Sequence, residues 1–181
     1  MKNLIVCAGG NEDFKFAQSI GVGLVNSAFS LGKILSQVKV DRVIFIGTCG
    51  IYQEGKILDI YESSNAANLE YADLFDSFYT PISNEIRLNV SHETMINSSN
   101  YICKDENIAQ EFFKKGVHIE NMEAYAVLSC AKMQGIEGIC YLCATNFCNE
   151  FAHEDFLKNH QKAKELLKDF LLDKKLIQEK N

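Results

Sequence analysis

Two acidic residues open the segment whose pattern is the most suggestive of chemistry. Residues 119–126 read I-E-N-M-E-A-Y-A and place Glu120 and Glu123 three positions apart at the start of a predicted helix, where they would be neighbours. An acidic first turn usually complements the helix dipole, which is enough to explain Glu120. Glu123 is followed by apolar residues. A half-buried carboxylate needs hydrogen-bond donors, and two ribose hydroxyls could supply them.

Two glycine-containing segments are the next candidates. Residues 19–27, S-I-G-V-G-L-V-N-S, place Gly21 and Gly23 before a helix, where free N–H groups would favour an anion. An ordinary tight turn into a helix explains this segment equally well. Residues 47–50, G-T-C-G, follow a predicted strand; their glycines allow a close ligand approach and the Thr48 hydroxyl can donate. A plain turn at the strand exit is the alternative.

The elements that must position these residues alternate between strand and helix. Apolar runs predict strands over Leu4–Ala8, Val40–Ile46, Ile57–Tyr61, Phe78–Ile82, Ile86–Val90 and Gly138–Ala144. Helical spacing predicts helices over Leu24–Val38, Asp105–Lys115, Asn121–Gln134 and His153–Leu172. This alternation indicates one domain over residues 1–181, a three-layer α/β/α fold with a mixed, largely parallel sheet. Ligands bind beyond the carboxyl ends of such strands, which favours residues 47–50 and 145–149 as the site.

Composition narrows the class of partner. The 181 residues carry a formal charge of −6 and only two arginines, Arg42 and Arg87, so there is no basic stripe for a nucleic acid. No apolar run is long enough to span a membrane. The N-terminal residues suit a buried strand better than a signal peptide. We therefore expect a small-molecule partner, with no nucleic acid and no membrane.

Seven cysteines without a targeting signal indicate a reducing compartment, so we expect a cytoplasmic protein with free thiols. Cys140, Cys143 and Cys148 have the spacing of a metal site, but no nearby fourth Cys or His completes a tetrahedral set. Cys140 and Cys143 should moreover face opposite sides of one strand. No metal site is expected.

The order of the motifs resembles that of a known superfamily. A glycine turn and helix, then G-T-C-G, then M-E-A-x-A, is similar to the order in purine nucleoside phosphorylases and methylthioadenosine nucleosidases. The resemblance covers most of a chain that is a short variant, with an early hairpin missing after Glu12 and Asp13. It implies a homo-oligomeric enzyme acting on purine nucleosides, in which Arg87 or His92 could complete a neighbouring subunit's pocket.

The resemblance also assigns residues to the sugar. Glu123 would bind the ribose hydroxyls and Met122 would pack against the ribose. The floor of the base and sugar pocket would be formed by Thr48, Cys49 and Gly50.

For the base, residues 97–102 resemble the segment whose aromatic side chain stacks on the purine. Tyr101 would be the stacking ring, and the backbone of Ile102 would bond the purine edge. Such stacking contributes about 1–3 kcal/mol per base in nucleic-acid complexes. The alternative is that Tyr101 is a partly buried core aromatic.

The last predicted strand departs from the nucleosidase pattern. Nucleosidases of this superfamily carry an Asp after this strand that protonates the leaving purine, whereas Asn146 stands here, as in the phosphorylases that handle 6-oxopurines. An amide N–H can stabilise negative charge on the purine, but it cannot transfer a proton as a carboxylic acid can. The alternative is a structural Asn146 that caps the turn after the strand.

The resemblance therefore predicts a phosphorylase-like pentosyltransferase with Asn146 and Glu123 as its catalytic residues. Inorganic phosphate, bound by Gly21, Gly23 and Thr48, would be the co-substrate and would yield a free base and (deoxy)ribose 1-phosphate; no other cofactor is expected. The arginine that hexameric phosphorylases place just before the second glycine segment is absent, since Phe45 stands there.

Two alternatives stay open. A hydrolytic nucleosidase of the methylthioadenosine or adenosylhomocysteine type would use water, oriented by Glu12 or Asp13. A catalytically silent nucleoside-binding protein would have kept the fold after losing both the acid and the arginine.

Overall fold

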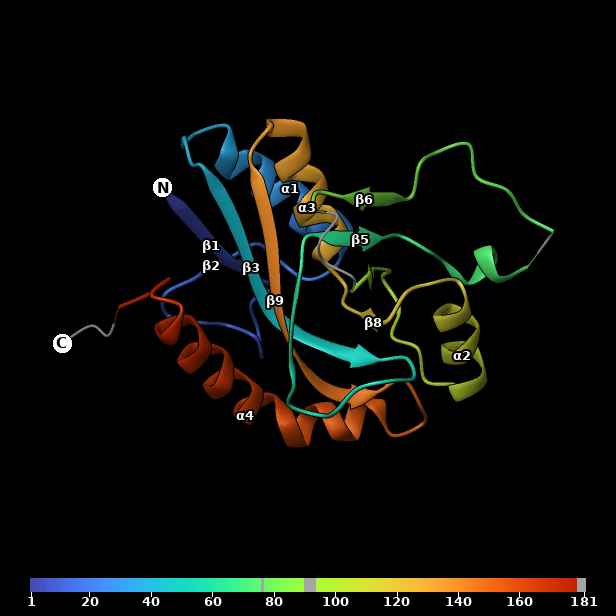
Figure 1. Ribbon diagram of the computed structural model, residues 1–181. Coiled ribbons are helices and arrows are strands. Elements are labelled where there is room, and N and C mark those ends of the chain that lie inside the picture. The colour runs from blue at the N-terminus through green and yellow to red at the C-terminus, as the bar shows by residue number, and fades with distance from the viewer. Residues whose placement is uncertain (76, 90–93, 179–181) are drawn as a thin grey trace.

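A mixed sheet runs through the computed structural model, which describes residues 1–75, 77–89 and 94–178 (Figure 1). Within these residues its strands are β1 (Asn3–Cys7), β2 (Gln18–Ser19), β3 (Arg42–Ile51), β4 (Ile60–Ser63), β5 (Asn65–Ala67), β6 (Glu85–Arg87), β7 (Ile96–Asn97), β8 (Ile119–Glu120) and β9 (Glu137–Phe147). The helices are α1 (Leu24–Leu35), α2 (Glu106–Lys114), α3 (Ala124–Gln134) and α4 (Ala152–Asp173), with a 3-10 turn over Tyr71–Leu74.

The two longest strands, β3 and β9, form the centre of the sheet. They pair in parallel over their whole length, and β1 and β2 continue the parallel sheet beyond β3. Strand β4 runs antiparallel along β9. On the edge of β3 away from β9, β1 pairs with the first half of the strand, and β8 pairs antiparallel with its last two residues. From β8 the sheet continues through β7 and β5 to β6. The sheet is therefore mixed, as predicted.

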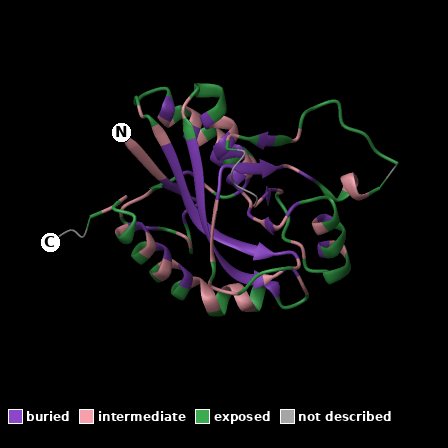
Figure 2. Cartoon of the chain, viewed as in Figure 1, coloured by how far each residue is buried: buried purple, intermediate pink, exposed green. Residues whose placement is uncertain are grey.

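Helices cover both faces of this sheet, which confirms the predicted three-layer arrangement (Figures 1 and 2). Alternate residues of β3 point to opposite faces, as the pleat requires. Val43 and Phe45 belong to the apolar cluster with α1 and α3. Ile44 and Ile46 pack in the cluster that buries one side of α4. In the described part of the chain, no helix has both the length and the apolar character to cross a membrane.

The main differences from the predicted elements concern strands. Helix bounds agree to within a few residues, whereas β3 and β9 continue beyond their predicted ends. Residues 47–50 are therefore strand and not a turn, because both long strands keep pairing with each other there. Residues 78–82 form no strand, and Val90, the end of another predicted strand, lies outside the described residues. Cys140 and Cys143 lie in opposite clusters, as expected.

The packing of α4 gives a direct test of this arrangement. Leu167 is fully buried against the sheet, while Leu157 on the same helix is 49% exposed. We expect Leu167→Ala to lower the free energy of unfolding by about 2–5 kcal/mol, because it leaves a cavity in the core. Leu157→Ala, the matched control, should change it by less than about 1 kcal/mol. Denaturant unfolding of the three proteins measures both values, and equal effects would contradict the packing.

Candidate functional site

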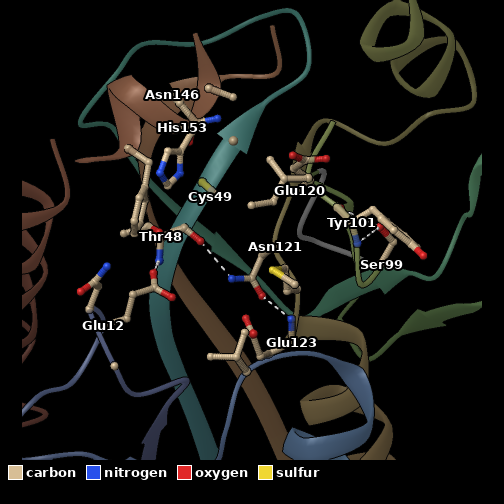
Figure 3. A pocket seen from close by; sticks show the side chains of 18 of the residues that line it. Glu12, Thr48, Cys49, Ser99, Tyr101, Glu120, Asn121, Glu123, Asn146 and His153 are labelled. Carbon is tan, nitrogen blue, oxygen red and sulfur yellow. Dashed lines mark hydrogen bonds between the residues drawn. The ribbon is translucent and has the colours of Figure 1, made fainter. Parts of the chain in front are cut away.

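A cavity of about 300 Å³ opens at the carboxyl ends of β3 and β9. Figure 3 shows it from close by, with Glu12 and Glu123 toward one end and Glu120 and Asn146 toward the other. All residues that the sequence analysis assigned to the substrate line this one cavity: Thr48, Cys49, Gly50, Tyr101, Ile102, Met122, Glu123 and Asn146. Their roles toward a ligand stay predictions.

Two carboxylates share one end of the cavity. Glu123 is 2% exposed, and its Oε1 accepts the Gly23 N–H at 2.8 Å. Burial raises the pKa of Glu123 to about 7, and repulsion from Glu12 adds to this rise. Glu12 accepts the Thr48 N–H. Burial raises the pKa of Glu12 as well, although the hydrogen bonds from Thr48 and the charge of Lys164 lower it. Two acids with raised pKa values facing one cavity are typical of a catalytic site.

Asn121 holds this end together and was missed in the sequence analysis. Its Oδ1 accepts the N–H groups of Glu123 and Ala124, both at 2.9 Å, so it caps the start of α3. Its Nδ2 donates to the Thr48 carbonyl at 2.9 Å, which ties α3 to β3. The signal in the sequence was the preference of Asn for positions just before a helix.

A bulge in β9 places Asn146. Cys49 pairs with Ala144 but Gly50 pairs with Asn146, so Thr145 is one extra residue on β9. Asn146 is 6% exposed; its Oδ1 accepts the Thr145 hydroxyl at 2.9 Å, and its Nδ2 donates to the Phe147 carbonyl at 3.1 Å. Asn146 thus lies within a strand and caps no turn, which contradicts that alternative.

Tyr101 and Ile102 line the cavity on a loop outside the core. Tyr101 is 85% exposed and Ile102 is 53% exposed, so the alternative of a core aromatic is wrong. Ser99 shapes this loop, because its hydroxyl accepts the Tyr101 N–H at 3.1 Å. A ring held on a loop beside a cavity is free to stack on a flat ligand.

The glycine turn that was predicted to hold phosphate is engaged within the chain. The Gly21 N–H donates to the Ala8 carbonyl at 3.0 Å, and the Gly23 N–H donates to Glu123. Both glycines have positive φ angles, which suits the tight turn. Val22 between them lines the cavity, but Gly21 and Gly23 do not.

Glu120 has a different setting from the one predicted. It lies on β8 and not in the first turn of α3, which begins four residues later. Its carboxylate accepts the Cys103 N–H, at 3.1 Å to Oε1 and 3.3 Å to Oε2. Burial raises the pKa of Glu120 to about 7, against the lowering effect of the contacts from Cys103, Cys148 and Tyr52. The interpretation that Glu120 only complements the dipole of α3 is therefore wrong.

Other candidates lie away from the cavity. Asp13 is exposed and accepts the Ser19 hydroxyl at 2.8 Å, so of the two acids proposed for water only Glu12 lines the cavity. Arg87 pairs with Glu85 on β6, and His92 lies outside the described residues. Within residues 1–75, 77–89 and 94–178, no cluster of three or more His, Cys, Asp or Glu could hold a metal ion.

The raised carboxyl pKa values predict how stability depends on pH. Because the pKa is about 7 for Glu120 and Glu123 in the folded chain against an ordinary 4.5, the folded chain binds these protons more tightly. Their contribution to the free energy of unfolding therefore falls as pH rises from about 4.5 to about 7. Denaturant unfolding at about pH 5 and about pH 8 should show a smaller fall for Glu120→Gln than for the unchanged protein. An identical fall would contradict the assignment.

Solved structures of other proteins share the fold that surrounds this cavity. No protein-family model matches the sequence, and no curated protein does. A putative 5′-methylthioadenosine/S-adenosylhomocysteine nucleosidase from Francisella philomiragia is similar, with a TM-score of 0.80 and 14% identity over 96% of this chain and 98% of that one. So is a futalosine hydrolase mutant of Helicobacter pylori, with a TM-score of 0.76 and 13% identity over 96% and 100% of the two chains.

A third similar structure is an aspartate-to-asparagine mutant of the Helicobacter pylori nucleosidase with 5′-methylthioadenosine in its active site. Its TM-score is 0.77, with 14% identity over 95% of this chain and 98% of that one. The chain has the fold of the nucleoside phosphorylase and nucleosidase superfamily. At these sequence identities the similarity establishes the nucleosidase fold only. The substrate of this chain has to be inferred from its own residues.

The comparison corrects the predicted reaction. The similar structures are nucleosidases and a futalosine hydrolase, which are hydrolases, and this overturns phosphorolysis and the pentosyltransferase class. The contacts within this chain agree, because the N–H groups of Gly21, Gly23 and Thr48 all donate within the chain. The Thr48 hydroxyl, which was also assigned to phosphate, interacts with Glu12. Phe45, at the position of the missing arginine, is fully buried in the core beneath α1 and α3.

Proposed function

We propose that the chain is a hydrolytic purine nucleosidase, which cleaves the N-glycosidic bond of a purine nucleoside with water. The observation that carries this proposal is that Glu12 and Glu123 face the same cavity as Asn146 and Tyr101. One cavity thus offers acids for a sugar and a water at one end, and an amide and a ring for a base at the other. A 5′-methylthioadenosine-type nucleoside is the first substrate to test, since a protein of this fold holds it.

At the acidic end, the two carboxylates suit the charge that develops during cleavage. Breaking the glycosidic bond builds positive charge on the ribose, and repulsion from Glu12 already raises the pKa of Glu123. A cationic sugar between them relieves that repulsion, so it is stabilised more than the neutral substrate. Glu12 accepts a proton from the attacking water, while Glu123 accepts hydrogen bonds from the ribose hydroxyls.

Toward the opposite end, the cavity suits a purine. Tyr101 offers a ring for stacking, and the Ile102 backbone can bond a base edge. The Asn146 amide can donate to the leaving base, in exchange for the weak local bond to the Phe147 carbonyl at 3.1 Å. Met122 and the β3 residues Thr48, Cys49 and Gly50 complete the lining, and the glycosidic bond would sit against them.

Two features of the proposal concern the whole protein. Free thiols at all seven cysteines agree with a cytoplasmic location. The sequence resemblance favours a homo-oligomer, which light scattering coupled to size-exclusion chromatography would measure. A monomer at working concentration would contradict this part alone.

One assay tests the reaction. The protein is incubated with 5′-methylthioadenosine, adenosine, inosine and guanosine, each with and without inorganic phosphate, and free base and sugar are followed. The expected result is release of base and free sugar at equal rates with and without phosphate, the sugar being 5-methylthioribose for 5′-methylthioadenosine and ribose for the other three. Release that requires phosphate and yields a sugar 1-phosphate would overturn hydrolysis.

The same assay decides the silent alternative, which the absence of an acid at Asn146 favours. Nucleoside binding seen by calorimetry, with no base released from any of the four substrates, would make the chain a nucleoside-binding protein. In that case Glu123 and Asn146 would keep binding roles only.

A further inference from the structure

Three residues of neighbouring strands form one row across the floor of the cavity. Gly50 on β3 pairs directly with Glu120 on β8 and, on its other side, with Asn146 on β9. Directly paired residues of adjacent strands point to the same face of a sheet. Glu120 and Asn146 therefore lie on the same face of the sheet, on either side of the one residue of the row that has no side chain.

The distances from a Cβ built on Gly50 show how close the neighbouring side chains come to this position. A Cβ added at Gly50 would lie 2.9 Å from Asn146 Nδ2, 3.0 Å from Cys148 Sγ and 3.2 Å from Glu120 Cγ. Both Glu120 and Asn146 line the cavity, as Tyr101 and Ile102 do. In Figure 3, Glu120 lies on the side of Tyr101 and Asn146 on the side of His153. A flat base resting on Tyr101 would thus meet an amide and a carboxyl group together.

The leaving purine needs a proton, and this arrangement supplies one. An amide can stabilise the purine anion but holds no transferable proton at neutral pH. The other two carboxyl groups of the cavity, Glu12 and Glu123, lie toward the opposite end. We propose that Glu120 is the proton donor to the leaving base, taking the role that Asn146 cannot fill. This inference rests on the proposed hydrolysis.

The step balances without any further reactant. The C1′–N9 bond breaks and its electron pair stays on the purine, which takes the Glu120 proton on a ring nitrogen. The water oxygen bonds to C1′ and its proton passes to Glu12. The products are a neutral purine and ribose, and one proton then returns through solvent from Glu12 to Glu120.

The surroundings of Glu120 keep a proton available near neutral pH. Its pKa of about 7 results mainly from burial. The titratable groups that interact with it are Cys49, Tyr52, Cys103 and Cys148, and burial raises the pKa of each above its ordinary value. They therefore stay neutral in the range where Glu120 titrates. A donor with its pKa near the working pH is the most effective acid catalyst.

The test compares Glu120→Gln with Glu111→Gln, an exposed control on α2. The Glu120→Gln variant is expected to fold normally, since the new amide oxygen can still accept the Cys103 N–H. With 5′-methylthioadenosine, we expect Glu120→Gln to lower kcat by about 50-fold, because acid catalysis is lost while Asn146 remains. The fall of kcat above about pH 7 in the unchanged protein should vanish in this variant. The comparison with the variant assigns the fall of kcat above about pH 7 to Glu120.

A second substrate separates proton donation from structural damage. The nitrophenolate of 4-nitrophenyl β-D-riboside leaves without a proton, so Glu120→Gln should hydrolyse it within about threefold of the unchanged rate. Equal losses on both substrates, or no loss on the nucleoside, would overturn the role of Glu120 while leaving the nucleosidase intact. An unchanged protein that releases no base from any nucleoside would overturn both proposals.

Discussion

Glu12→Gln is expected to lower kcat for nucleoside hydrolysis by about 1,000-fold, because it removes the base that takes the proton from water. The substitution is nearly isosteric, and a Gln oxygen can still accept the Thr48 N–H that Glu12 accepts. The loss should therefore appear in kcat with little change in KM, as for an interaction made only in the transition state. Steady-state kinetics with 5′-methylthioadenosine measures it.

The neighbouring acid provides a matched control. Asp13→Asn also removes one carboxylate, but Asp13 is exposed, binds Ser19 and does not line the cavity. It should keep kcat within about threefold of the unchanged value. A larger loss in Asp13→Asn than in Glu12→Gln would assign the base to Asp13 instead.

The pH dependence of the reaction gives an independent test of Glu12 as the base. A base acts in its deprotonated form, so activity should fall as pH decreases through the pKa of Glu12. Burial raises the pKa of Glu12, and this acidic limb should thus lie above the ordinary carboxylate value of 4.5. In Glu12→Gln the limb set by Glu12 should disappear. This leaves the limb set by Glu123, whose pKa of about 7 should fall once the charge of Glu12 is removed. A limb that persists unchanged would belong to another group.

Local patterns were enough to predict most of the scaffold. Helical spacing predicted α1, α2, α3 and α4, and the glycine after α3 was predicted as its end. Gly135 has the left-handed conformation that ends many helices. Buried apolar runs predicted β1 and the cores of β3 and β9. Each of these signals depends on residues close together in the sequence, which is why the sequence alone reveals them.

The pairing between strands could not be predicted in the same way. The ends of β3 and β9 contain small and polar residues, such as Thr48 and Asn146, and lack the apolar runs of a buried strand. They are strands because each continues to pair with the other. Strand β8 is two residues long and exists through its partners on both sides, so Glu120 was assigned to a helix.

The composition of the cavity was predicted better than the interactions within it. Glu123 and Asn146 lie about the same cavity as expected from the sequence, but their hydrogen-bond partners come from distant segments. Gly23 is 100 positions from Glu123, and the bulge that places Asn146 depends on the register with β3. Such contacts form only when the sheet closes, and they decide which N–H groups stay free for a ligand.

Glu123→Ala is expected to lower kcat/KM for ribonucleosides at least about 100-fold, because the sugar loses the group that orients it over the attacking water. Part of this loss is structural. In the unchanged protein the buried Gly23 N–H donates to Glu123 at 2.8 Å, and Glu123→Ala leaves it without this acceptor. Glu123→Gln keeps an acceptor for that N–H, so the difference between the two variants measures the structural part. Glu111→Ala on exposed α2 is the control for removing a carboxylate elsewhere.

The sugar itself can show whether Glu123 binds it. A 2′,3′-dideoxynucleoside lacks the 2′ and 3′ hydroxyls that Glu123 is proposed to bind. With this substrate the unchanged protein should therefore already lack most of the contribution of Glu123. We therefore expect Glu123→Gln to slow this substrate far less than it slows the matching ribonucleoside, a coupling of about 1–2 kcal/mol. Equal losses on both substrates would mean that Glu123 acts through charge or packing alone, because the effect of a residue that hydrogen-bonds the hydroxyls must depend on whether the hydroxyls are present.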